Sequence, residues 1–251
     1  MSKTIDLNCD MGESFGAWQM GNDEAVMPWI TSANIACGFH AGDFATMQHT
    51  VALAKKFNVA IGAHVSLPDL QGFGRREMRI SPNEAYAMSL YQIGALQAVA
   101  RAQHVRVVHV KPHGALYNMA AKDRELADAI ARAVHDADET MILVGLAGSE
   151  SVRAAEAVGL RAAHEAFADR RYETDGSLIS RREADAVFHD ADAAVAQAVH
   201  IVKSGKVNSR DGEIDIFADT ICIHGDRLDA GVFAKRLRVA LEGAGVSVIA
   251  L

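Results

Sequence analysis

The chain has 251 residues, half of them hydrophobic and 23% charged, which is ordinary for a soluble globular protein. Its formal net charge of −7 disfavours nonspecific binding to nucleic acids or anionic membranes, because both require a basic surface. No apolar run approaches the roughly 18 residues of a membrane span. We see no signal peptide and therefore expect a cytoplasmic protein.

Three cysteines, Cys9, Cys37 and Cys222, lie in strand-like runs and show no C-x-x-C spacing. This pattern favours reduced thiols in a hydrophobic core. A catalytic thiol is the lesser alternative, because none of the three has an adjacent base in the sequence.

Strand-like runs that end in polar residues recur along the chain, and the first covers residues 4–10. Side chains alternate between the two faces of a strand, so Asp6, Asn8 and Asp10 share one face. We expect this face to point into a barrel, with Asp10 at the rim. A loop with two glycines follows at residues 11–16.

The second run covers residues 32–38. It places Asn34 on the face that leads to His40, provided that the extended geometry continues to this histidine. We expect Asp43 to cap a helix that reaches Phe57, since apolar residues recur there at helical spacing.

The third run, residues 59–65, ends inward at His64. The loop after it contains the sequence 72–74, Gly-Phe-Gly, but the third glycine of a dinucleotide-binding fingerprint is missing. We therefore reject a nucleotide site here. Arg75 and Arg76 remain candidates for holding an anion, or for a structural ion pair.

A helix over residues 82–103 is marked by a capping box between Ser81 and Glu84. The strand after it, residues 107–113, carries the largest set of polar residues on one face.

His109, Lys111 and His113 share that face, and a helical pattern begins at Gly114. Burying these polar groups is costly unless they have partners or a ligand. On an extended strand His109 and His113 lie about 13 Å apart, too far for one metal ion unless the strand bends.

Predicted strands and helices continue to alternate in the second half of the chain. We expect helices at 123–135 and 149–158, a purely structural strand at 141–146, and a strand at 160–166 that turns Glu165 inward.

Two polar segments, 167–182 and 204–213, are predicted to be mobile loops over the barrel mouth. A last inward strand at 220–224 ends at His224, and a helix at 229–242 follows it.

This order of strands and helices predicts one domain over residues 1–251, an α/β fold of the TIM-like (β/α) barrel type. Active sites of such barrels lie at the C-terminal ends of the strands. His40, His64, His113 and His224 end strands there, together with Asp10, Lys111 and Glu165. We assign a structural role to the five histidines that lie within or beside predicted helices, which are His49, His104, His135, His189 and His200.

Two kinds of site fit these residues. One is a metal centre built from His40, His64, His113 and His224. The other is a metal-free acid–base site, in which a carboxylate or histidine activates water and a cation binds an anionic group.

Several motifs resemble the LamB/YcsF family, the A subunit of prokaryotic ATP-dependent 5-oxoprolinase, over nearly the whole chain. The motifs are the sequences at 6–13, 33–43, 62–64, 68–76, 111–117, 167–172 and 224–226. The resemblance implies a seven-stranded barrel of the glycoside hydrolase/deacetylase type. It also implies cleavage of 5-oxoproline to L-glutamate with ATP hydrolysis, in complex with B and C subunits.

The chain has no phosphate-binding G-x-x-x-x-G-K-[ST] loop, so phosphate chemistry is expected to depend on those partners. We expect this chain to direct water at a phosphorylated lactam. The catalytic candidates are Asp10, His64, Lys111, His113 and Glu165. The substrate-binding candidates are Asn8, Asn34, His40, Arg75, Arg76, Asp169, Arg170, Arg171 and His224.

Two alternatives stay open at this point. The chain could be a metal-dependent deacetylase or amidohydrolase that acts alone, or a non-catalytic binding component of the complex.

Overall fold

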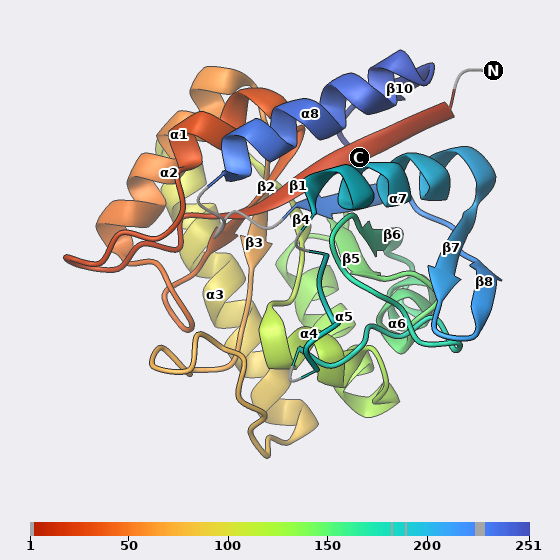
Figure 1. Ribbon diagram of the computed structural model, residues 1–251. Coiled ribbons are helices and arrows are strands. Elements are labelled where there is room, and N and C mark those ends of the chain that lie inside the picture. Colours follow the sequence, from red (N-terminus) through yellow and green to blue (C-terminus); the bar gives the residue numbers. More distant parts are fainter. Residues whose placement is uncertain (1–2, 182, 189, 224–228) are drawn as a thin grey trace.

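Seven parallel strands close into a barrel in the computed structural model, which describes residues 3–181, 183–188, 190–223 and 229–251 (Figure 1). They pair in the order β1, β2, β3, β4, β5, β6 and β9, and β9 pairs again with β1. The predicted barrel of the seven-stranded type is thereby confirmed. The barrel strands are β1 (Lys3–Met11), β2 (Ser32–Ala36), β3 (Ala60–His64), β4 (Val107–Val110), β5 (Ile142–Leu146), β6 (Arg161–Phe167) and β9 (Thr220–Ile223).

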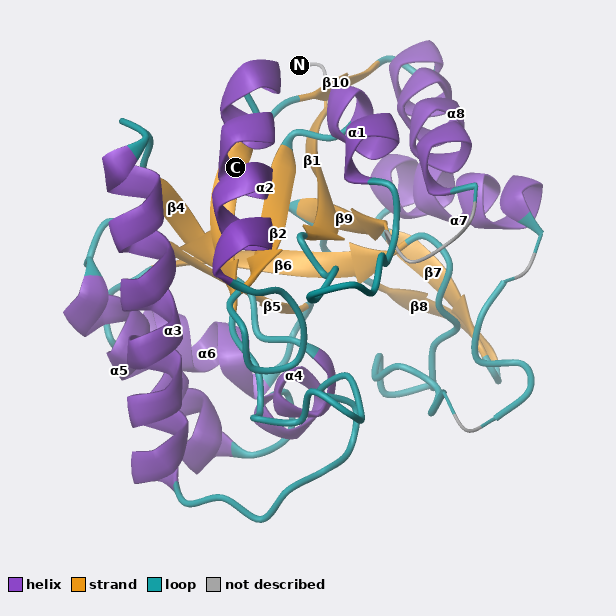
Figure 2. Cartoon of the chain, turned by 90° about the vertical axis from the view of Figure 1, so that its left-hand side faces the viewer, coloured by secondary structure: helices purple, strands orange, loops and turns teal. Residues whose placement is uncertain are grey.

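Helices surround the strands, as Figure 2 shows. They are α1 (Asp23–Val26), α2 (Phe44–Phe57), α3 (Pro82–Ala102), α4 (Gly114–Ala120), α5 (Arg124–Ala137), α6 (Glu150–Ala157), α7 (Ala191–Ser204) and α8 (Ala230–Gly243), with a 3-10 turn, η1 (Met27–Trp29). A short strand, β10 (Val246–Val248), extends the sheet beside β1. The sequence pattern did not predict α1 and η1, which are each only about one turn long.

The two faces of β1 divide as the alternation predicted. Leu7 and Cys9 are fully buried in the hydrophobic core. Asp6, Asn8 and Asp10 lie on the opposite face and are hydrogen-bonded to other strands of the barrel. A polar interior is tolerable only because these groups satisfy one another.

Two helix starts agree with the capping residues in the sequence. A carboxylate oxygen of Asp43 accepts the backbone N–H of Thr46 at 2.8 Å, ahead of α2. Ser81 and Glu84 form the reciprocal hydrogen bonds of a capping box at the start of α3. These caps satisfy N–H groups that have no partner within the helix.

The prediction of a loop at residues 204–213 is wrong. This segment ends α7 and forms most of an antiparallel hairpin, β7 (Lys206–Ser209) and β8 (Gly212–Asp215). Val207 is fully buried and pairs with Ile214, which packs against the core. The polar residues of the hairpin hid this alternation in the sequence.

The extended geometry of β2 does not continue to His40. The strand ends at Ala36, and a tight turn follows in which the Gly38 N–H donates to the carbonyl of Ala41. Gly38 and Gly42 both have positive φ, at 88° and 75°, which glycine adopts without strain. The turn still brings the His40 ring against the rings of His64 and His113.

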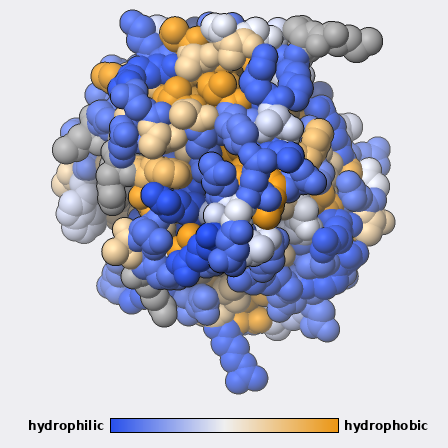
Figure 3. Space-filling view, turned by 45° about the vertical axis from the view of Figure 1, so that its right-hand side comes forward, coloured by the Kyte–Doolittle hydropathy of each residue, from blue (hydrophilic) through white to orange (hydrophobic). Residues whose placement is uncertain are grey.

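The face of the molecule drawn in Figure 3 is mostly hydrophilic, with hydrophobic side chains in small groups between polar ones. Among the described residues, no helix combines the length and the apolar character needed to cross a membrane.

Candidate active site

A cavity of about 600 Å³ lies at the C-terminal end of the barrel. Asp10, His64 and Lys111, which come from or just after three different strands, contribute to its lining. The start of α4 and the segment 177–181 form other parts of the wall. This volume is typical of a site for a small molecule.

Lys111 lies just beyond the last residue of β4, and its ammonium group is enclosed by acceptors. Its Nζ lies 2.7 Å from Glu165 Oε1 and 3.0 Å from Asp10 Oδ1. It also donates to Asn8 Oδ1 at 3.0 Å and to the Cys222 sulfur at 3.1 Å. Burial would lower the pKa of Lys111, but the Asp10 carboxylate raises it well above its usual value.

Asp10 uses its two carboxylate oxygens differently. Oδ1 accepts hydrogen bonds from Asn34 at 2.9 Å and from Lys111 at 3.0 Å. Oδ2 lies 3.3 Å from His64 Nε2, and both residues line the cavity. Although burial raises the pKa of Asp10, His64 and Lys111 outweigh it and hold the pKa well below its usual value. The group is therefore an anion at neutral pH.

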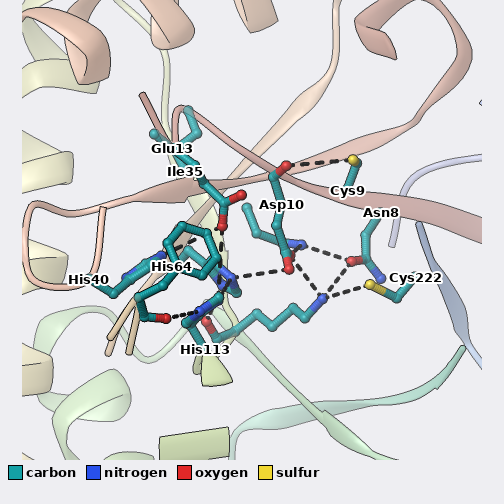
Figure 4. Close-up of polar contacts among 12 residues, drawn as sticks. Asn8, Cys9, Asp10, Glu13, Ile35, His40, His64, His113 and Cys222 are labelled. Carbon is teal, nitrogen blue, oxygen red and sulfur yellow. Dashed lines mark hydrogen bonds and ion pairs between the residues drawn. The ribbon is translucent and has the colours of Figure 1, made fainter. Parts of the chain in front are cut away.

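Glu13, His40, His64 and His113 gather on one side of Asp10, with Asn8 and Cys222 on the other (Figure 4). One ligand atom of each member of this Glu/His group lies within 4.8 Å of the others. Carboxylate and imidazole groups in this arrangement could hold a divalent transition-metal ion. Asp10 therefore lies between a candidate metal centre and the lysine network.

Two histidines of the group, His40 and His113, are kept neutral by their surroundings. Burial lowers the pKa of His40 well below its usual value. Burial, with the neighbouring His40 and His64, does the same to the pKa of His113. Neutral imidazole is the form that can accept a proton or bind a metal.

Gly74 allows the loop after β3 to lie against these histidines. Its φ of +64° suits glycine, and a Cβ there would lie 2.8 Å from His40 Cβ and 3.0 Å from a carbon of the His113 ring. The neighbouring Phe73 carbonyl accepts from His113 Nε2 at 2.9 Å. The loop motif therefore positions the site rather than binding a nucleotide.

Among the predicted arginines, Arg170 and Arg75 line the cavity. Arg170 is 5% exposed and donates to the Ile179 carbonyl at 2.6 Å, while its Nε has no hydrogen-bond partner among the described residues. Burial and then Arg181 lower the pKa of Arg170 to about 10, so the side chain stays cationic at neutral pH. It is well placed to bind an anionic group.

Other predicted binding residues lie away from the cavity. Arg76 is paired with Asp69 in the loop after β3, the structural alternative noted for it. Arg171 lies over the ring of Phe188, 4.4 Å from its centroid, and Asp169 is buried outside the cavity wall. The remaining prediction, His224, lies outside the described residues.

Asn8, Asn34 and Glu165 are not among the residues that line the cavity, but they contact Asp10 and Lys111, which do. Asn34 donates to both Asn8 and Asp10, and Asn8 donates to Glu165 at 2.9 Å. Glu165 is fully buried. These three side chains orient Asp10 and Lys111, as the groups behind the reacting residues do in preorganised sites.

Glu13 was assigned no role from the sequence, although it belongs to the first motif. It lies two residues beyond the end of β1, where strand parity no longer predicts direction. The sequence does contain a signal, a carboxylate three residues after Asp10 and next to a glycine. In the structure, Gly12 has a φ of +68° and turns the chain before Glu13.

Residues 5–251 match the model of the LamB/YcsF family. A relative from Bordetella pertussis, named as the A subunit of 5-oxoprolinase, is 58% identical over 249 residues, and the match covers 99% of both chains. The crystal structure of a lactam utilization protein from Thermus thermophilus is 47% identical, with a TM-score of 0.93 over 99% of this chain and all of that one.

A family 4 carbohydrate esterase from Streptomyces lividans shares the fold at 13% identity, with a TM-score of 0.51 over 98% of this chain and 91% of that one. It confirms the deacetylase type of barrel that the sequence implied.

Proposed function

Since this chain belongs to the LamB/YcsF family, we propose that it is the A subunit of an ATP-dependent 5-oxoprolinase, which opens the lactam 5-oxoproline to L-glutamate. The observation that carries the proposal is that relatives of that name are 54–58% identical to this chain over nearly its whole length. The cavity supports it, because an ionised carboxylate, two histidines and an arginine converge there.

The chemistry of the substrate explains the need for ATP. A five-membered lactam is a poor electrophile, because amide resonance stabilises its carbonyl. Transfer of the terminal phosphoryl group of ATP to the lactam oxygen makes the ring carbon electrophilic. Water then adds to this carbon, the C–N bond breaks as the nitrogen takes a proton, and the resulting acyl phosphate is hydrolysed to glutamate and phosphate.

Asp10 is the better candidate for the base that activates water. Asp10 lines the cavity, whereas Glu165 is fully buried and bound to Lys111 and Asn8. A general base must reach the proton that it abstracts, directly or through one water molecule.

His64 and His113 are the candidates for proton delivery to the lactam nitrogen. Both line the cavity, and His64 Nε2 lies 3.3 Å from Asp10 Oδ2. Asp10 could therefore pass a proton to this histidine pair after taking it from water.

Lys111 positions Asp10, because its ammonium group already has four partners. Arg170 is the candidate for the substrate carboxylate or the phosphoryl group, since guanidinium binds both in a fork geometry. Its Nε, which has no partner among the described residues, supports this role. Arg75, which also lines the cavity, is a second candidate.

The phosphoryl transfer is assigned to partner subunits B and C in the cytoplasm, because the sequence contains no phosphate-binding loop motif. ATP is then a co-substrate of the complex rather than a ligand that this chain binds by itself.

The test is glutamate release from 5-oxoproline and ATP, measured for this chain alone and with the candidate B and C subunits. We expect release only when all three chains and ATP are present. Release by this chain alone, without ATP, would overturn the proposal.

A second candidate is a metal-dependent amidohydrolase that acts without partners, which the Glu13, His40, His64 and His113 group favours. The same experiment separates the two, because this enzyme would need a metal but neither ATP nor partners.

A further inference from the structure

We infer that Glu13, His40, His64 and His113 bind one divalent transition-metal ion, with Zn²⁺ as the representative ligand. The inference deepens the proposed function, because the site shares the cavity with Asp10. The metal can nevertheless be measured without any assay of turnover.

The separations between ligand atoms suit a single ion. His64 Nε2 and His113 Nδ1 are 2.8 Å apart, and Glu13 Oε1 lies 3.7 Å from His40 Nε2 and 4.0 Å from His113 Nδ1. Two atoms that bind one zinc ion tetrahedrally lie roughly 3.4 Å apart, given bonds of about 2.1 Å. The three observed distances lie on both sides of this value and within roughly 0.6 Å of it, so side-chain shifts of about half an ångström bring these atoms to tetrahedral spacing.

The hydrogen bonds of His64 and His113 fix which nitrogens carry hydrogen. His64 Nδ1 faces the Lys111 carbonyl at 2.9 Å, and His113 Nε2 faces the Phe73 carbonyl at 2.9 Å. A carbonyl oxygen only accepts, so both of these nitrogens must be donors. A backbone carbonyl that fixes the tautomer in this way is characteristic of metal-binding histidines.

The consequence is that the other two nitrogens, His64 Nε2 and His113 Nδ1, point lone pairs at each other across 2.8 Å when both rings are neutral. Two lone pairs at this distance repel, and only a shared proton or a bound cation relieves the repulsion. A shared proton can bridge only His64 Nε2 and His113 Nδ1, whereas a metal ion can bind all four ligand atoms.

His40 provides the independent observation that points to an ion. It is fully buried, and neither ring nitrogen has a hydrogen-bond partner among the described residues. Its ring stacks on that of His113, with centroids 3.9 Å apart, and both rings place a nitrogen within 4.0 Å of the same oxygen of Glu13. Figure 4 shows His40 directed toward this group. A buried imidazole without a partner is costly, and metal binding would satisfy it.

The donor set indicates which metal. Three imidazoles and one carboxylate suit Zn²⁺ and its transition-metal neighbours, whereas Mg²⁺ and Ca²⁺ prefer oxygen ligands. When bound, such an ion supplies a Lewis acid beside Asp10. The ion would occupy His64 Nε2, the atom that lies 3.3 Å from Asp10 Oδ2, so in the metal-bound protein His64 and His113 would hold the ion instead of delivering a proton.

The experiment measures metal content and affinity in the untagged full chain. The protein is stripped with a chelator, then titrated calorimetrically with ZnCl₂, and the zinc retained after desalting is measured by mass spectrometry. We expect about one zinc ion per chain and a higher thermal unfolding temperature with zinc, because a ligand that binds only the folded state stabilises it.

His40→Gln and Glu13→Gln are the test variants, and His135→Gln at a half-buried position on α5 is the matched control. We expect each test variant to bind zinc at least tenfold more weakly and the control to bind like the wild type. Two test variants are used so that a folding defect in one leaves the other informative.

A wild-type chain that retains no zinc and shows no binding heat would overturn the inference, as would unchanged affinity in both folded test variants. Zinc binding in a chain that releases no glutamate with its partners and ATP would instead overturn the proposed function alone.

Discussion

The two oxygens of the Asp10 carboxylate have separate surroundings. Oδ1 is held by Asn34 and Lys111, whereas Oδ2 lies beside His64 at the cavity. Such a division fixes the orientation of a carboxylate and leaves one oxygen for chemistry. Replacing the side chain by its amide keeps the shape and removes the anion.

We predict that Asp10→Asn lowers glutamate release by the complete complex at least 100-fold, because a positioned general base contributes roughly 10²–10⁴ in rate. Circular dichroism should show an intact fold. Asp128→Asn, at a half-buried position on α5 outside the cavity, should keep wild-type turnover. Normal turnover by Asp10→Asn would remove this residue from the mechanism.

His109 is a buried histidine with a structural role. Its Nε2 lies 2.8 Å from Asn34 Oδ1, and burial lowers the pKa of His109 to about 3. An unfolded histidine has a pKa of about 6.5. The pKa of His109 is lower in the folded protein than in the unfolded one. The contribution of the neutral ring to the unfolding free energy is therefore fully present above pH 6.5 and is lost as the pH falls toward 3.

We predict that the wild type loses up to about 1.4 kcal/mol more unfolding free energy per pH unit than His109→Gln, within this pH window. Urea unfolding at pH 7.5, 6.5, 5.5 and 4.5 measures the difference. His135→Gln, which changes a half-buried histidine on α5, should follow the wild type. Parallel curves for all three proteins would show that His109 titrates normally.

At the scale of a strand, Gly62 in β3 makes room for the His109 ring of β4. A Cβ at this position would lie 2.0 Å from His109 Nε2, the atom bonded to Asn34. The ring cannot move without breaking that hydrogen bond. The alternation of β3 therefore places its smallest residue beside the bulkiest inward residue of its neighbour.

We predict that Gly62→Ala destabilises the protein by about 1–3 kcal/mol through overpacking. Gly94→Ala is the matched control, because a Cβ there, on α3, meets nothing within 4 Å. It should stabilise the helix by about 0.5–1 kcal/mol. Urea unfolding measures both, and a similar effect of the two changes would contradict the packing argument.

At the scale of the whole molecule, the Lys111 ammonium joins strands that are distant in sequence. It bonds to Asn8 and Asp10 of β1, Glu165 of β6 and Cys222 of β9. The network therefore bridges the closure of the barrel. Removing one member leaves a buried charge without compensation.

We predict that Lys111→Met costs about 3–5 kcal/mol of unfolding free energy. The double variant Lys111→Met with Glu165→Gln should cost less than the sum of the two single changes, by about 0.5–3 kcal/mol. Chemical denaturation of the four proteins gives this coupling. Additivity of the two changes would show that the charges do not depend on each other.

Strand parity was enough to predict that Asp10, His64 and Glu165 point inward, and that the strands form a barrel with polar groups at one end. The reason is that alternation is local: the stereochemistry of an extended chain fixes it, whatever the strand packs against. Helix caps at Asp43 and Ser81 are equally local, since each cap and its partner lie three residues apart.

Only the tertiary structure decided which loop residues meet at the site. Glu13 and His40 arrive on turns, Arg170 faces the cavity while Arg171 lies over Phe188, and the hairpin at 206–215 was mistaken for a loop. Beyond the end of a strand, the direction of a side chain depends on glycine conformations and on segments far away in the sequence. Their packing, rather than any local pattern, brings the histidines to one point.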